Sequence, residues 1–139
     1  MAVITDDYSA NTSASSRPVL DPTLPTLYST RMSPYCQRVR LLLNAKEIPF
    51  QVVNINIWDK PKWFLGVTPL NKVPTAVEPN GRVTFESLIM AQYLDEEYRA
   101  GTKQFLPSDP YAKARELLQI ERIIAIVADP IRDASLESK

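Results

Sequence analysis

Residues 26–57 read TLYSTRMSPYCQRVRLLLNAKEIPFQVVNINI, and this stretch decides the fold. Residues 26–30 are rich in β-branched and aromatic types and predict a short strand. Ser33 and Pro34 then predict a helix start, because a serine hydroxyl can bind free amide groups and proline tolerates the first turn. The helix should run over residues 34–46. Residues 50–57 alternate apolar and polar types, so the whole stretch predicts a strand–helix–strand unit with parallel strands.

The segment after this unit predicts a hairpin and a second helix. Residues 60–66 are expected to form a short helix, and residues 75–78 and 82–85 flank Asn80-Gly81, a strong hairpin signal. Ser87 should cap a helix over residues 88–98. The order β-α-β followed by β-β-α is that of a thioredoxin-like α/β domain.

A long helix is expected near the end of the chain, with Asp109 as its cap, Pro110 in its first turn and Pro130 as its stop. Its wide apolar stripe must pack on the α/β unit or on another chain. We therefore divide the sequence into a flexible segment at 1–25, an α/β domain at 26–106, and the start of an all-α C-terminal domain at 107–139.

Composition excludes several classes of function. Lysine plus arginine equals aspartate plus glutamate at 16 each, so no charge surplus favours nucleic acid or an anionic membrane. The chain has no histidine and one cysteine, which argues against histidine-based catalysis, most metal sites and an internal disulfide. No apolar run is long enough to span a membrane. These features predict a soluble cytoplasmic protein that binds a small molecule or another protein.

Three motifs could carry chemistry, and each also has a purely structural interpretation. Ser33 and Cys36 lie at a strand-to-helix junction, where the helix dipole stabilises a thiolate, but they could equally be a cap and an apolar filler. Val73-Pro74 could hold a cis bond that presents the Val73 backbone to an extended peptide, or could be an ordinary loop. Glu86-Ser87 could bind an α-amino acid end, or Ser87 could simply be a cap.

Taken together and in order, these motifs resemble the glutathione site of thioredoxin-like transferases, with the omega class as the best match. The resemblance spans about residues 23–124. Its matching stretches are residues 27–40, Val53-Asn-Ile-Asn-Ile57, Lys60-Pro-Lys-Trp-Phe64, Asn71-Lys-Val-Pro74, Glu86-Ser87, Tyr93-Leu-Asp-Glu96 and Leu106-Pro-Ser-Asp-Pro-Tyr111.

The resemblance implies the role of each site residue. Val73 would pair its backbone with the cysteinyl part of glutathione, and Pro74 would be cis. Glu86 and Ser87 would hold the γ-glutamyl end, and Lys60 would meet the glycyl carboxylate. Glutathione is then the co-substrate, no metal is needed, and the second substrate is a small electrophile or an oxidised thiol compound.

Two departures from the omega pattern keep alternatives open. Omega enzymes have a cysteine where this chain has Ser33, so Ser33 could instead donate a hydrogen bond to the glutathione thiolate, or Cys36 could act as a redox residue in a glutaredoxin-like reductase. The helical domain is also short, which leaves an exposed apolar stripe for a homodimer or another partner. A non-catalytic interaction module is therefore the alternative to a transferase.

Overall fold

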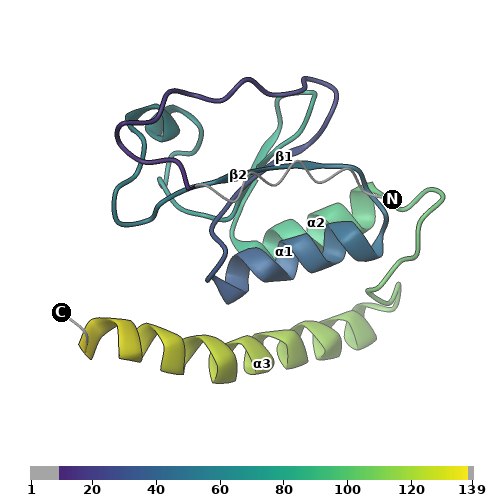
Figure 1. Cartoon of the computed structure of the whole chain (residues 1–139). Coiled ribbons are helices and arrows are strands. Elements are labelled where there is room, and N and C mark those ends of the chain that lie inside the picture. The colour runs from purple at the N-terminus through teal and green to yellow at the C-terminus, as the bar shows by residue number, and fades with distance from the viewer. Residues whose placement is uncertain (1–9, 138–139) are drawn as a thin grey trace.

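The computed structural model describes residues 10–137 and contains a four-stranded mixed sheet with three α-helices (Figure 1). The chain forms β1 (Thr26–Ser29), α1 (Pro34–Ala45), β2 (Gln51–Asn54), a 3-10 turn η1 (Lys62–Gly66), β3 (Thr75–Val77), β4 (Val83–Phe85), α2 (Ser87–Glu97) and α3 (Pro110–Glu137). The strand order is β2-β1-β3-β4. β1 is parallel to β2 and antiparallel to β3, which is antiparallel to β4. The predicted thioredoxin-like order is confirmed.

The helices form layers on one side of the sheet. Figure 1 shows α1 and α2 side by side beneath the strands, with α3 running below them on the side away from the sheet. Asp109 caps α3 as predicted, because its Oδ2 accepts a hydrogen bond from the Ala112 backbone N–H at 2.8 Å. The long third helix therefore contacts the sheet domain through α1 and α2 rather than through the strands.

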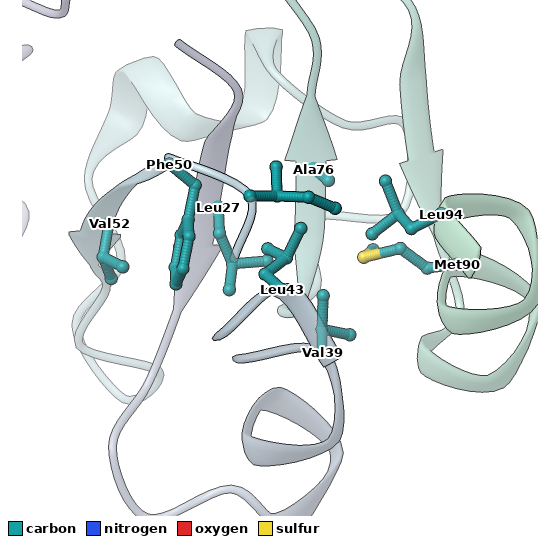
Figure 2. Close-up of a cluster of buried hydrophobic side chains, with 9 residues drawn as sticks. Leu27, Val39, Leu43, Phe50, Val52, Ala76, Met90 and Leu94 are labelled. Carbon is teal, nitrogen blue, oxygen red and sulfur yellow. The ribbon is translucent and has the colours of Figure 1, made fainter. Parts of the chain in front are cut away.

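The main core lies between the sheet and the first two helices. Leu27 from β1 and Ala76 from β3 meet Val39 and Leu43 from α1 in this cluster, and α2 supplies Met90 and Leu94 (Figure 2). Each fully buried side chain of this size contributes about 1.5–3 kcal/mol. This cluster fixes where the amino ends of both helices lie.

A second apolar cluster covers the opposite face of the sheet. Successive strand residues point to opposite faces, so Leu27 joins the first cluster and Tyr28 joins the second. The Tyr28 ring packs against Trp63 and Phe64 of η1, with ring centroids 6.3 and 5.6 Å away. Because both faces are covered, every residue of β1 and β2 is buried, including the polar ones.

The segment before β1 packs along β2. The Asn11 backbone N–H donates to the Asn54 carbonyl at 2.7 Å, and its carbonyl accepts from the Asn56 N–H at 2.9 Å. The Trp63 indole Nε1 donates to the Ser15 carbonyl at 3.0 Å. Residues 1–9 of the segment predicted to be flexible lie outside the described residues, whereas residues 10–25 have ordered partners that the prediction did not foresee.

Two predicted helix boundaries are wrong. Pro130 does not end α3 but lies inside it. It is exposed, so water can bind the carbonyl group that loses its backbone partner. Ser87 is not the cap of α2, because Glu86 occupies the cap position and Ser87 is the first helical residue. Across residues 10–137, no helix is long and apolar enough to cross a membrane.

Candidate functional site

A pocket of about 210 Å³ lies where the amino ends of α1 and α2 meet the start of β3. β1 and β3 are neighbours in the sheet, so the loop before β3 and the starts of both helices converge at one edge. The pocket is lined by Tyr35, Leu70, Lys72, Val73, Pro74, Phe85, Glu86 and Ser87. It therefore brings together four of the predicted site residues, namely Val73, Pro74, Glu86 and Ser87.

The predicted site residue Ser33 is the cap of α1 and lies beside the pocket without lining it. Its Oγ accepts a hydrogen bond from the Cys36 backbone N–H at 3.3 Å. The accepted bond does not use the single hydrogen of the Ser33 hydroxyl, but the same hydroxyl also makes a hydrogen bond to the Cys36 thiol. Ser33 is half-buried and lies two residues before Tyr35, which lines the pocket.

Cys36 faces the interior instead of the pocket. Its side chain is fully buried, and its sulfur accepts a hydrogen bond from the Thr30 backbone N–H at 3.4 Å. Burial raises the pKa of the Cys36 thiol, and the hydrogen bonds from Thr30 and Ser33 offset this only in part. The neutral thiol is therefore favoured, and a bulky disulfide has no direct approach to it.

The loop before β3 carries the Val73–Pro74 peptide bond in the cis form. Pro74 is buried, and Val73 is half-buried and packs against the second apolar cluster. The Thr75 hydroxyl donates to the Lys72 carbonyl at 2.8 Å, which closes the loop on itself. The backbone of this pocket wall is thus held at both ends.

Lys60 lies beside this loop but does not line the pocket. Its Nζ donates to the Asn71 carbonyl at 2.8 Å, and Asn71 immediately precedes Lys72 of the pocket wall. An ammonium group has three donors, so Lys60 has hydrogens beyond the one given to Asn71. The structure does not bring Lys60 into contact with the other predicted site residues.

The α2 side of the pocket consists of Glu86 and Ser87. Glu86 is exposed and adopts φ 66°, a left-handed conformation that is uncommon for residues other than glycine. Ser87 is buried, and its Oγ accepts a hydrogen bond from Arg38 Nη1 at 3.0 Å. The free backbone amides of the first helical turn make this end attractive to an anion.

Arg38 is the residue at this site that sequence reasoning missed. It lies on α1, 49 residues before Ser87, and its Nη2 also donates to Glu121 Oε1 of α3 at 3.0 Å. No local sequence pattern predicts such a contact, because the contact depends on the packing of three helices. Within residues 10–137 there is no cluster of three or more acidic, cysteine or histidine side chains that could hold a metal ion.

Comparisons with known proteins agree with this geometry. The family model for the glutathione S-transferase N-terminal domain matches residues 27–102. The chain is 43% identical over 104 residues to pyrimidodiazepine synthase of Drosophila melanogaster, covering 73% of this chain and 42% of the relative. It is 44% identical over 95 residues to glutathione S-transferase omega-1 of Sus scrofa, covering 68% and 39%. The chain thus spans about two fifths of the length of these relatives.

A solved structure shares the same backbone arrangement. It is a glutathione S-transferase of Methylobacterium radiotolerans in complex with glutathione sulfonate. Its TM-score is 0.62 at 30% sequence identity, over 82% of this chain and 50% of that chain.

The strand order and the placement of the helices are those of a thioredoxin-like domain. The chain belongs to the glutathione S-transferase family, and its sequence is of the omega type.

Proposed function

We propose that this chain binds glutathione in the pocket between α1 and α2 and acts as an omega-like glutathione transferase. The proposed reaction is conjugation of glutathione to a small electrophile or glutathione-dependent thiol transfer. The observation that carries the proposal is the convergence of Val73, Pro74, Glu86 and Ser87 on one pocket of about 210 Å³. The pairs Val73-Pro74 and Glu86-Ser87 lie at the two ends of the β3–β4 hairpin, and the pairing of Thr75 with Phe85 brings them together.

Glutathione would be held mainly by its two charged ends. The Ser87 hydroxyl and the first amides of α2 would donate to the γ-glutamyl α-carboxylate, and the Glu86 carboxylate would accept from the neighbouring ammonium group. The Val73 backbone would pair with the cysteinyl unit. Lys60 would reach the glycyl carboxylate with the donors that its bond to Asn71 leaves free.

Ser33 is the residue that we propose to activate the glutathione thiol. Its hydroxyl hydrogen would turn from the buried Cys36 sulfur to the glutathione sulfur, which lowers the pKa of the bound thiol and favours the thiolate. The thiolate sulfur then attacks the electrophilic carbon, a C–S bond forms, and the leaving group departs with its electron pair. Full burial of Cys36 favours Ser33 over Cys36 for this role.

The partners and compartment follow from the same proposal. Helix α3 exposes Tyr111, Leu118, Ile123 and Ile126, each at least 60% exposed, which supports self-association of the chain through α3. A cytosolic protein is proposed because the sequence has one cysteine and therefore no internal disulfide. The same apolar face would serve the alternative role of an interaction module.

Calorimetric titration of glutathione into the unmodified chain and its Ser33→Ala, Glu86→Ala and Ser87→Ala variants tests the proposal. Saturable binding should weaken about tenfold in the Glu86 and Ser87 variants, since each loses a charge-assisted hydrogen bond. Ser33→Ala should keep most of the affinity but raise the pKa of the bound thiol, measured by thiolate absorbance. Turnover of a chlorinated dinitrobenzene separates a transferase from an interaction module. Absence of saturable binding to the unmodified chain would overturn the proposal.

A further inference from the structure

Arg38 joins the proposed glutathione pocket to helix α3. Its guanidinium donates from Nη1 to the Ser87 hydroxyl oxygen and from Nη2 to Glu121 Oε1, both at 3.0 Å. The Arg38 side chain is only 10% exposed, whereas that of Glu121 is 53% exposed. One side chain thus links the starts of two helices of the sheet domain with the middle of the third helix.

The bond from Arg38 decides how the Ser87 hydroxyl can act. A guanidinium only donates hydrogen bonds, so Arg38 occupies an acceptor position of Ser87 Oγ. The single hydrogen of the hydroxyl is then left for an acceptor. A carboxylate in the pocket is such an acceptor, and the guanidinium behind the serine is always protonated, which favours a negatively charged partner.

Arg38 also faces open space beside the pocket. A neighbouring cavity of about 300 Å³ is lined by Arg38 and Glu121 and shares Tyr35, Glu86 and Ser87 with the first pocket. The buried Nε of Arg38 has no hydrogen-bond partner within the described part of the chain, so one donor of the group remains unused. Arg38 therefore lies behind Ser87, which lines both cavities, and can act on a ligand there through that serine.

We propose that Arg38 is a positioning residue for the carboxylate of the bound ligand. It directs the Ser87 hydrogen toward the γ-glutamyl α-carboxylate, and Glu121 holds the guanidinium in this orientation. The inference rests on the proposed binding of glutathione, and it gives α3 a direct part in a site that the sheet domain otherwise builds. Because the Glu121 side chain of this ion pair is 53% exposed, the pair adds little stability by itself, and its effect should appear in binding.

A double-mutant cycle on glutathione affinity tests this role. Arg38→Gln and Ser87→Ala should each weaken glutathione binding about tenfold, the usual effect of a lost charge-assisted hydrogen bond. Because Arg38 acts through Ser87, the double variant should bind no more weakly than Ser87→Ala alone. Glu121→Gln should weaken binding by only about two- to threefold, since the guanidinium keeps its bond to Ser87.

Two controls separate positioning from general damage to the fold. Arg40→Gln removes the same charge from the same helix, but Arg40 bonds Ser29 and Asn54 on the sheet, so glutathione affinity should not change. Arg38→Lys keeps the charge and the aliphatic stem, and it should recover part of the affinity lost in Arg38→Gln. If Arg38→Gln fails to fold, the lysine variant takes its place in the cycle.

A ligand change makes the test specific for the carboxylate. γ-Aminobutyryl-cysteinylglycine is glutathione without the γ-glutamyl α-carboxylate, and its affinity should be the same for the unmodified chain and for Arg38→Gln. Equal losses for both ligands, or additive losses in the cycle, would overturn the role of Arg38 while leaving glutathione binding intact. No binding of glutathione to the unmodified chain would overturn this inference together with the proposed function.

Discussion

Helices α1 and α2 lie side by side, yet their two ends are built in opposite ways (Figure 1). At the amino ends, the Ser87 hydroxyl lines a pocket and accepts from Arg38, which leaves its own hydrogen for a ligand, and Ser33 lies two residues before Tyr35 of the same pocket. At the carboxyl ends, Lys46 and Asp95 form an ion pair at 2.9 Å with side chains 0% and 1% exposed. One end offers hydrogen bonds to a ligand, and the other end uses all of its own.

At the carboxyl ends of α1 and α2, which we call the closed end, every hydrogen-bond donor of the Lys46 ammonium has an acceptor. Lys46 Nζ donates to the Asp95 carboxylate, to the Asp95 carbonyl at 3.2 Å and to the Lys103 carbonyl at 2.9 Å. The Asp95 carboxylate also accepts from the backbone N–H groups of Phe105 and Leu106. This network ties the ends of α1 and α2 to the segment leading to α3. We therefore expect the carboxyl ends of the helix pair to contribute mainly to stability and the amino ends mainly to binding.

The largest expected effect comes from breaking the closed end. Asp95→Ala leaves the Lys46 ammonium buried without its counter-charge, and such a change costs about 3–5 kcal/mol of the free energy of unfolding. Chemical denaturation measures this loss. The folded fraction should still bind glutathione with unchanged affinity, because Asp95 does not line the proposed pocket.

The matched control is Glu97→Ala, two residues further along the chain. It removes a carboxylate whose partner, Arg82, is 58% exposed, and exposed pairs contribute only about 0–1 kcal/mol. A loss for Asp95→Ala as small as that for Glu97→Ala would show that the buried pair does not hold the closed end together.

A smaller effect is expected from acid pH. Burial by itself would raise the pKa of Asp95, but the hydrogen bonds from Leu106, Lys46 and Phe105 outweigh it and hold the pKa below its ordinary value. A carboxyl group with a depressed folded-state pKa contributes stability above its unfolded-state pKa of about 3.9 and loses it as the pH falls through the folded-state value. The unfolding free energy of the unmodified chain should therefore drop below about pH 4.

The Asp95→Ala variant serves as the reference for this pH dependence. Its unfolding free energy should fall less steeply over the same interval, since the group that gains the proton is missing. Parallel pH curves for the two proteins would assign the acid loss to other carboxyl groups and remove Asp95 from the explanation.

The contrast between the two ends also explains what the sequence could and could not predict. The order of strands and helices, the hairpin at Asn80-Gly81 and the Ser33 cap depend on neighbours within a few residues, and the structure confirms them. The contacts Arg38–Ser87 and Lys46–Asp95 each join residues 49 positions apart. They depend on how α1 and α2 pack, which no local pattern encodes.

The burial of the second strand and the end of α3 both depend on packing. Alternation in residues 50–57 predicted the strand but not its burial: η1 and the segment before β1 cover the second face, so Gln51–Asn54 is wholly buried. Pro130 is a strong local stop signal, yet the helix continues past it. The candidate site residues Val73, Pro74, Glu86 and Ser87 were predicted from their order along the chain and line one pocket, whereas the choice between a reactive and a buried Cys36 depended on packing.

The smallest expected effect concerns the amino ends of α1 and α2, which we call the open end, and it separates stability from binding. Glu86 holds φ 66°, and glycine adopts such a conformation without the steric cost of a Cβ atom. Glu86→Gly should therefore raise the free energy of unfolding by about 1 kcal/mol relative to Glu86→Ala, which keeps the strained conformation. Both variants lose the carboxylate that we propose to accept from the glutathione ammonium, so both should bind glutathione equally weakly.

Gly81 supplies the inverse control for this comparison. It has φ 85° with open space around its Cα, so Gly81→Ala adds a side chain in a left-handed conformation without a contact clash. This change should lower stability by about 1 kcal/mol and leave glutathione affinity unchanged, because the hairpin turn lies outside the pocket. If Glu86→Gly were less stable than Glu86→Ala, the left-handed conformation of residue 86 would not cost stability. The role of Glu86 would then rest on its carboxylate alone.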